Sequence, residues 1–188
     1  RADNILYYKS NIPLAEIEAK ENGCSVGADM QQALNYAGTL GVPFVFSSNG
    51  DGFLMHDRTG LADRIERALT LDEFPSPAQL WRQYCQWKGL ETAQARHTVE
   101  MPYFDDGTGR APRYYQANAV NSTVEAVAQG QQRILLVMAT GTGKTYTAFQ
   151  INWRLWKSGT KKRICFWPTA ISWSIKPRIT ISNRSARR

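Results

Sequence analysis

Met138-Ala-Thr-Gly-Thr-Gly-Lys-Thr145 is the stretch that decides how the second half of the chain is expected to fold. It follows an apolar run, Ile134-Leu-Leu-Val137, and precedes a segment with helical spacing. In such a strand–loop–helix, backbone N–H groups of the loop and of the helix start face an anion. The pattern predicts a phosphate-binding loop, in which Lys144 reaches the β- and γ-phosphates of a nucleotide and Thr145 ligates Mg²⁺. Met138 replaces the first glycine of the full pattern, and a glycine-rich turn before an ordinary helix is the alternative.

Size and composition narrow the class of protein. The 188 residues, 43% of them hydrophobic, suit one domain or two small ones. No apolar run approaches the ~18 residues of a membrane span, and no signal peptide opens the chain. Three well-separated cysteines, Cys24, Cys85 and Cys165, form no metal-binding or disulfide pattern. We therefore expect a cytoplasmic protein without a membrane partner.

The net charge of +7 is concentrated at one end of the chain. Eight basic residues and no acidic residue lie from Lys161 onward, which leaves 15 basic and 16 acidic residues among residues 1–160. The overall charge therefore does not indicate a nucleic-acid surface on the folded part.

Hydrophobic spacing and turn residues predict an α/β protein. Periodicity is lost over residues 96–112, which contain two prolines and two glycines and are the expected linker between two domains. Strands are expected at residues 4–8, 14–20, 42–47, 133–138 and from 163 onward, with a hairpin within residues 42–55. Helices are expected at residues 26–40, 78–87, 114–129 and 144–156.

A candidate metal site lies in the first half of the chain. Glu18 and Lys20 are two residues apart in an expected strand and project from the same face, which Glu16 shares. Asp3 precedes the neighbouring strand. Two carboxylates offer Mg²⁺ hard oxygen ligands, and a lysine beside them can activate water and steady phosphate charge. A solvated strand face is the alternative, since charged side chains are usually exposed.

A pair of polar residues on the next expected helix extends this pattern. Gln32 and Tyr36 are four residues apart and therefore neighbours on the helix surface. Together with the preceding Asp…Glu-x-Lys, they resemble the extended PD-(D/E)xK pattern of one branch of that nuclease superfamily. A polar helical face with one half-buried tyrosine is the alternative.

Both halves together resemble the restriction (R) subunit of type I restriction–modification enzymes. The Ala-Thr-Gly-x-Gly-Lys-Thr form of the loop is similar to that of superfamily 2 helicases and translocases. The resemblance implies a partial PD-(D/E)xK nuclease domain over residues 1–95, a linker over 96–112 and the start of a RecA-like P-loop translocase domain over 113–166. It is carried by residues 1–3, 13–20, 25–36, 43–50, 113–116 and 133–145.

The resemblance also implies functions for individual residues. In this family ATP hydrolysis pulls double-stranded DNA past a methyltransferase core, and the nuclease cuts when translocation stalls. The partners implied are DNA and the methyltransferase and specificity subunits, and the cofactors are ATP and Mg²⁺. The implied nuclease residues are the metal ligands Asp3 and Glu18, the catalytic Lys20, and the supporting Gln32 and Tyr36. The implied nucleotide-binding residues are Gln116, which would read the adenine edge, and Thr140, Gly141, Thr142, Gly143, Lys144 and Thr145, the last also a Mg²⁺ ligand.

Three departures from the family suggest an inactive fragment. Nothing precedes the Asp3 region, and the acidic box that would hold Mg²⁺ in the motor is absent, so ATP turnover is not expected. From Trp167 onward the residues depart from the family pattern, and suitable codons give L-A-D-R-N-I-L in a neighbouring reading frame. We therefore expect residues 167–188 to be a frameshifted, poorly packed tail, with a basic phosphate-binding extension as the alternative. The alternative functions are a non-catalytic DNA- or nucleotide-binding module that docks on the methyltransferase core, and a free-standing P-loop NTPase.

Overall fold

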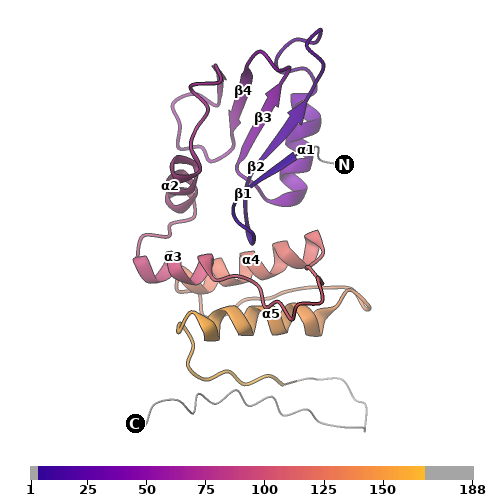
Figure 1. Cartoon of the computed structure of the whole chain (residues 1–188). Coiled ribbons are helices and arrows are strands. Elements are labelled where there is room, and N and C mark those ends of the chain that lie inside the picture. The colour runs from indigo at the N-terminus through magenta and orange to yellow at the C-terminus, as the bar shows by residue number, and fades with distance from the viewer. Residues whose placement is uncertain (1–3, 168–188) are drawn as a thin grey trace.

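The computed structural model describes residues 4–167, and its first half is built on one five-stranded sheet (Figure 1). The strands lie in the order β1-β2-β3-β4-β5. Strands β2 and β3 are parallel, joined by a crossover through helix α1 (Met30–Leu40), and all other neighbours are antiparallel. The strands are β1 (Asn4–Lys9), β2 (Ile12–Ala19), β3 (Phe44–Ser48), β4 (Phe53–Asp57) and β5 (Glu66–Leu69).

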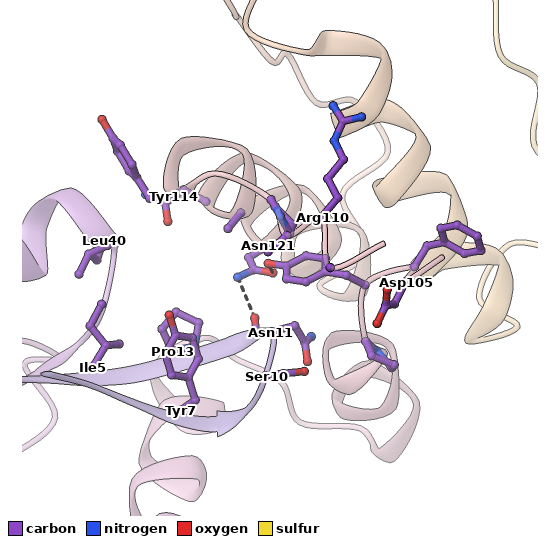
Figure 2. A pocket seen from close by; sticks show the side chains of 18 residues that line it. Ile5, Tyr7, Ser10, Asn11, Pro13, Leu40, Asp105, Arg110, Tyr114 and Asn121 are labelled. Carbon is purple, nitrogen blue, oxygen red and sulfur yellow. Dashed lines mark hydrogen bonds between the residues drawn. The ribbon is translucent and has the colours of Figure 1, made fainter. Parts of the chain in front are cut away.

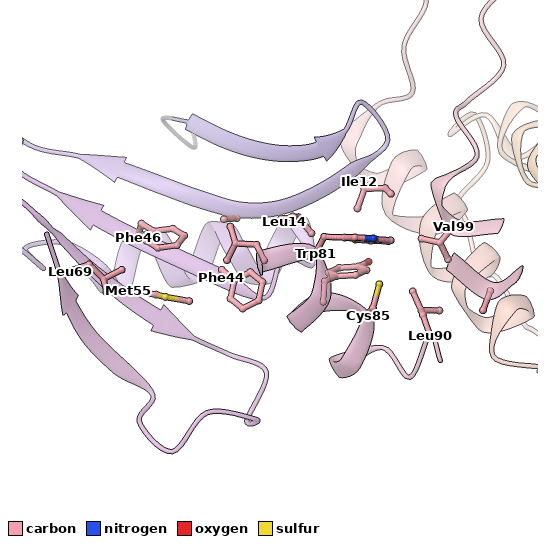
Figure 3. Close-up of a cluster of buried hydrophobic side chains, with 14 residues drawn as sticks. Ile12, Leu14, Phe44, Phe46, Met55, Leu69, Trp81, Cys85, Leu90 and Val99 are labelled. Atoms are coloured by element: carbon pink, nitrogen blue, oxygen red, sulfur yellow. The ribbon is translucent and has the colours of Figure 1, made fainter. Parts of the chain in front are cut away.

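The central strand β3 shows how the sheet is covered on both faces. Successive side chains of a strand point to opposite faces. Val45 packs with α1, whereas Phe44 and Phe46 belong to the larger core on the other face. Figure 3 shows this larger core extending from Leu69 at the sheet edge through Trp81 to Val99. Val99 lies beyond the predicted first domain, so the linker region takes part in the core of the sheet half.

Four further helices complete the described part of the chain. Helix α2 (Pro77–Trp87) begins with a capping box at Ser76 and a proline in its first turn, both typical helix starts. Helix α3 (Ala93–Glu100) follows it. Helices α4 (Tyr114–Ala128) and α5 (Lys144–Lys157) pack together around Val120, Val124 and Leu155. In Figure 1, α3, α4 and α5 form a layer beneath the β1–β2 turn.

The prediction of strands at 133–138 and from 163 onward is wrong for the described residues. Neither segment pairs with another strand, and Leu135 and Val137 are 89% and 83% exposed. An apolar run becomes a strand only where a neighbour satisfies its backbone hydrogen bonds. The RecA-like sheet is therefore not formed within residues 4–167. The expected tail lies outside the described residues except for Trp167, which is exposed.

Other elements were predicted with altered bounds or missed. The first helix begins at Met30 rather than at residue 26, because the residues before it form turns. The predicted hairpin is present as β3 and β4. Both β5 and α3 were missed, and α3 overlaps the predicted linker. Within residues 4–167, no helix is long and apolar enough to cross a membrane.

Candidate functional site

The first candidate site lies where β2 ends beside β3. Glu18 pairs with Ser47 of the parallel neighbour, and the backbone N–H of Lys20 donates to the Ser48 carbonyl at 2.8 Å. Glu18 is only 1% exposed, and Glu16, two residues earlier on the same face, is completely buried. The alternative of a solvated strand face is therefore wrong for both glutamates. Carboxylates are almost never fully buried unless they bind a partner group.

One oxygen of Glu18 holds two neighbouring side chains. Its Oε1 atom accepts a hydrogen bond from Lys20 Nζ at 2.9 Å and another from Gln32 Nε2 at 3.1 Å. Gln32 comes from α1, so the crossover helix reaches back to the strand that precedes it. The structure thus brings Glu18, Lys20 and Gln32 together as the sequence pattern suggested.

The other oxygen of Glu18 fits a cation. Oε2 is buried and has no hydrogen-bond partner within the described residues. A buried charged oxygen without a partner is costly, whereas Mg²⁺ binds such hard oxygens directly. The described residues contain no cluster of three or more His, Cys, Asp or Glu side chains, so they provide only part of a coordination shell. The other predicted ligand, Asp3, lies outside the described residues.

Lys20 is held between two carboxylates. Its Nζ lies 3.1 Å from Oδ2 of Asp29 as well as 2.9 Å from Glu18. Hydrogen bonds to Glu18 and then Asp29 raise the pKa of Lys20 well above its ordinary value. In this arrangement Lys20 is an ammonium group that offers charge and hydrogen bonds rather than a base. Sequence reasoning missed Asp29, because no part of the nuclease pattern includes it.

Tyr36 follows Gln32 by one turn of α1 and is half-buried. Its position agrees with the expected polar face of the helix, and its role remains a prediction.

The second candidate site is the glycine-rich loop before α5. Gly141 and Gly143 have φ angles of 80° and 86°, and Gly143 is the N-cap of the helix, with no side chain capping it. The first N–H groups of α5 therefore have no intrahelical partner and are available to an anion. Lys144 is exposed, and its Nζ donates to the Met138 and Ala139 carbonyls at 3.0 Å each. Thr145 is also exposed at the helix start.

Gln116 supports this loop from α4. Its Nε2 donates to the Thr142 carbonyl at 2.8 Å, and its Oε1 accepts from the Arg113 backbone N–H at 3.0 Å. A Cβ atom on Gly143 would lie only 2.5 Å from Gln116 Nε2. The positive φ favours glycine at position 143, and a Cβ atom there would displace the end of the Gln116 side chain. The sequence indicated Gln116 but not this contact with the loop backbone.

Comparisons with known proteins show which family the chain is similar to. Residues 110–170 match the family described as the res subunit of type III restriction enzymes (ResIII). The chain is 58% identical over 166 residues to the EcoAI type I restriction enzyme endonuclease subunit of Escherichia coli, covering 88% of this chain. The chain belongs to the family of type I restriction endonuclease subunits. It is also 35% identical over 135 residues, 66% of its length, to the EcoKI endonuclease subunit of Escherichia coli strain K12.

A solved structure supports the same assignment. A fragment described as an HsdR subunit of a type I restriction enzyme from Vibrio vulnificus YJ016 is 42% identical, with a TM-score of 0.74. The similarity covers 84% of this chain and 28% of that one. This restriction-subunit chain spans only 20% and 11% of the lengths of the EcoAI and EcoKI subunits.

A buried polar network joins the two halves of this restriction-subunit chain. Arg154 of α5 is completely buried and donates to Asn121 Oδ1 and to the Val99 carbonyl at 2.6 Å each. Asn121 in turn donates to the Asn11 carbonyl at 3.0 Å, the contact drawn in Figure 2. Asn11 lies in the β1–β2 turn, and its amide donates to the carbonyls of Val99 and Met101. Beside the network lies a cavity of about 670 Å³ between the sheet half and α4.

Proposed function

We propose that this chain carries the DNA-cleaving centre and the ATP-binding loop of a type I restriction endonuclease subunit. The observation that supports the proposal most directly is the buried, unpartnered Oε2 of Glu18 beside the Lys20 ammonium. The proposal includes a partial PD-(D/E)xK nuclease domain over residues 1–95, a linker, and the first part of a RecA-like P-loop domain over residues 113–166. DNA cleavage by relatives of this chain accords with such a centre, since two of them are named endonuclease subunits.

The proposed nuclease centre uses few residues, each with a separate task. Asp3 and Glu18 are the proposed Mg²⁺ ligands, and Lys20, Gln32 and Tyr36 complete the centre. When bound, Mg²⁺ would activate water and neutralise phosphate charge. Gln32 and Lys20 both engage Oε1 of Glu18, which leaves Oε2 as the oxygen available to the cation. The Lys20 ammonium would stabilise the negative charge that develops on the phosphate.

The proposed nucleotide site lies in the loop before α5. The positive φ angles of Gly141 and Gly143 allow the tight turn of the loop. Lys144 would contact phosphate, Thr145 would ligate Mg²⁺, and Gln116 would lie beside the adenine. Thr140 and Thr142 complete the loop. No acidic residue follows Glu125 in the 188-residue sequence. We therefore propose that residues 113–166 bind ATP through this loop, while the carboxylate that holds Mg²⁺ in such motors is not among these residues.

The proposed partners are double-stranded DNA and the methyltransferase and specificity subunits of the same system. In the whole subunit, ATP-driven translocation would precede cleavage. The second candidate function is a non-catalytic module that binds DNA or nucleotide and docks on the methyltransferase core. It is favoured by the small number of carboxylates around Glu18 in the described residues.

Metal binding by the full 188-residue chain tests the nuclease proposal. Mn²⁺, used as a paramagnetic substitute for Mg²⁺, is titrated and its bound fraction is measured by electron paramagnetic resonance. Glu18→Gln keeps the size and the Oε1 position but removes the charge, so we expect at least about tenfold weaker binding, because ligand charge sets such affinities. Plasmid nicking in Mg²⁺ is measured on the same samples.

Glu66→Gln is the matched control, because Glu66 is exposed on β5, where its carboxylate lies 2.9 Å from His56 Nδ1. It should bind Mn²⁺ like the unchanged chain. Metal binding that depends on Glu18 without nicking would favour the non-catalytic module. Equal Mn²⁺ affinity in Glu18→Gln and the unchanged chain would refute the assignment of Glu18 as a metal ligand.

A further inference from the structure

Asp29 adopts a left-handed backbone conformation that is uncommon outside glycine, although aspartate tolerates it better than most residues. Its φ of 62° makes it the one non-glycine residue with positive φ among residues 4–167. The left-handed region brings Cβ close to the following carbonyl oxygen, which is why glycine usually occupies it. Residues held in such conformations concentrate at functional sites, where the surrounding structure maintains them.

Helix capping does not explain the positive φ of Asp29. It occupies the N-cap position of α1, where an aspartate side chain normally accepts a hydrogen bond from the second or third N–H of the helix. Here the side chain makes no capping bond. Its Oδ2 instead lies 3.1 Å from Lys20 Nζ, so the carboxylate turns away from its own helix and toward the end of β2.

The two carboxylates that hold Lys20 differ in their surroundings. The Glu18 side chain is 2% exposed and has one oxygen free for a cation, whereas the Asp29 side chain is 56% exposed. A cation bound to Glu18 would compete with Lys20 for the negative charge of that carboxylate. Asp29 would still hold the ammonium in place.

We propose that Asp29 is a positioning residue that keeps the Lys20 ammonium at the nuclease centre while Glu18 binds the metal ion. The inference rests on the proposed function of Glu18, but the contact between Asp29 and Lys20 can be tested without DNA cleavage. Asp29 does not touch the reacting atoms in this scheme, and it acts through Lys20.

Acylation of lysines measures how well Lys20 is held. The full chain is treated briefly with an N-hydroxysuccinimide ester at fixed pH, with and without saturating Mn²⁺, and labelling of Lys20 is quantified by mass spectrometry. Lys157, exposed on α5, is the internal reference. In Asp29→Asn we expect labelling of Lys20 to rise by about two- to fivefold in Mn²⁺, the range that an exposed ion pair supports.

Asp29→Gly separates positioning from a purely structural role. Glycine suits a φ of 62° and leaves the helix start unstrained, but it removes the carboxylate. Positioning predicts that Asn and Gly variants both expose Lys20 to labelling, with Mn²⁺ affinity unchanged. Protection of Lys20 in both variants would overturn the inference.

Failure of the proposed metal site and failure of the proposed role of Asp29 give different experimental results. If Glu18→Gln binds Mn²⁺ as the unchanged chain does, the metal site is refuted whatever the labelling of Lys20. If Glu18→Gln weakens Mn²⁺ binding while Asp29→Asn leaves Lys20 protected, only the role of Asp29 is refuted.

Discussion

Replacement of Arg154 by methionine tests whether the polar network holds the two halves of the chain together. Arg154 is completely buried, and its guanidinium makes two charged hydrogen bonds of 2.6 Å. Each such bond contributes about 1.5–3 kcal/mol, but removing a buried cation also returns several kcal/mol of desolvation cost. Burial is also what lowers the pKa of Arg154.

The acceptors left behind determine the net loss. Asn121 Oδ1 would keep the hydrogen bond from the Tyr103 hydroxyl at 3.0 Å, and the Val99 carbonyl would keep the one from Asn11 Nδ2 at 3.1 Å. Neither acceptor becomes wholly unsatisfied, and methionine fills most of the volume. We therefore expect Arg154→Met to lower the free energy of unfolding by about 2 kcal/mol, below the ~3–5 kcal/mol of a broken buried ion pair.

Urea denaturation followed by tryptophan fluorescence and by circular dichroism measures this change. Lys157→Met lies one turn later on the exposed face of α5 and should alter stability by no more than about 0.5 kcal/mol. If Arg154→Met unfolds at the same urea concentration as the unchanged chain, the network does not stabilise the fold and the reasoning fails.

Two further predictions concern Gly143 and Cys85. Gly143→Ala should reduce binding of a fluorescent ATP analogue, measured by anisotropy, by about tenfold. Alanine disfavours the positive φ of this position, and its Cβ would displace the Gln116 amide that supports the loop. Undiminished binding would show that the loop tolerates another backbone conformation. Burial raises the pKa of Cys85 to about 11, so at pH 8 a disulfide reagent should label exposed Cys24 and Cys165 long before Cys85. Since the unfolded thiol loses its proton near pH 9, the contribution of Cys85 to the free energy of unfolding should fall between about pH 9 and 11, and an equal dependence in Cys85→Ala would contradict this.

The sheet half could be predicted well because its strands are marked by local features. The apolar run that contains β3, together with the turn after it, correctly predicted the hairpin of β3 and β4. Glu18, Lys20 and Gln32 were expected to share a site, and the parallel pairing of β2 with β3 brings α1 back over them. The start of α1 was misplaced by four residues, because the residues before Met30 form turns.

In the second half, the helices expected at residues 114–129 and 144–156 agree with α4 and α5 to within one residue, whereas the expected strands could not be judged from local features. Residues 133–138 have the composition of a strand, but a strand needs neighbours, and none lies beside them within residues 4–167. Helix α3 was missed because its eight residues are mostly polar, and only contacts far away in sequence bury Ala95, Thr98 and Val99. The strand β5 was missed for the same reason, since only Leu69 of its four residues is buried.

The segment after α3 limits how such chains could exchange parts during evolution. Both the N–H and the carbonyl of Phe104 bind the side chain of fully buried Gln150, at 2.8 and 3.1 Å. If recombination near residue 95 replaced everything after that point, Val99 would be replaced too. The core of the sheet half, which Val99 completes, would then lose a native side chain. An event near residue 110 would require the newcomer to supply a matching Asn121 and Arg154. The sheet half and the helical half are therefore inherited most safely as one unit.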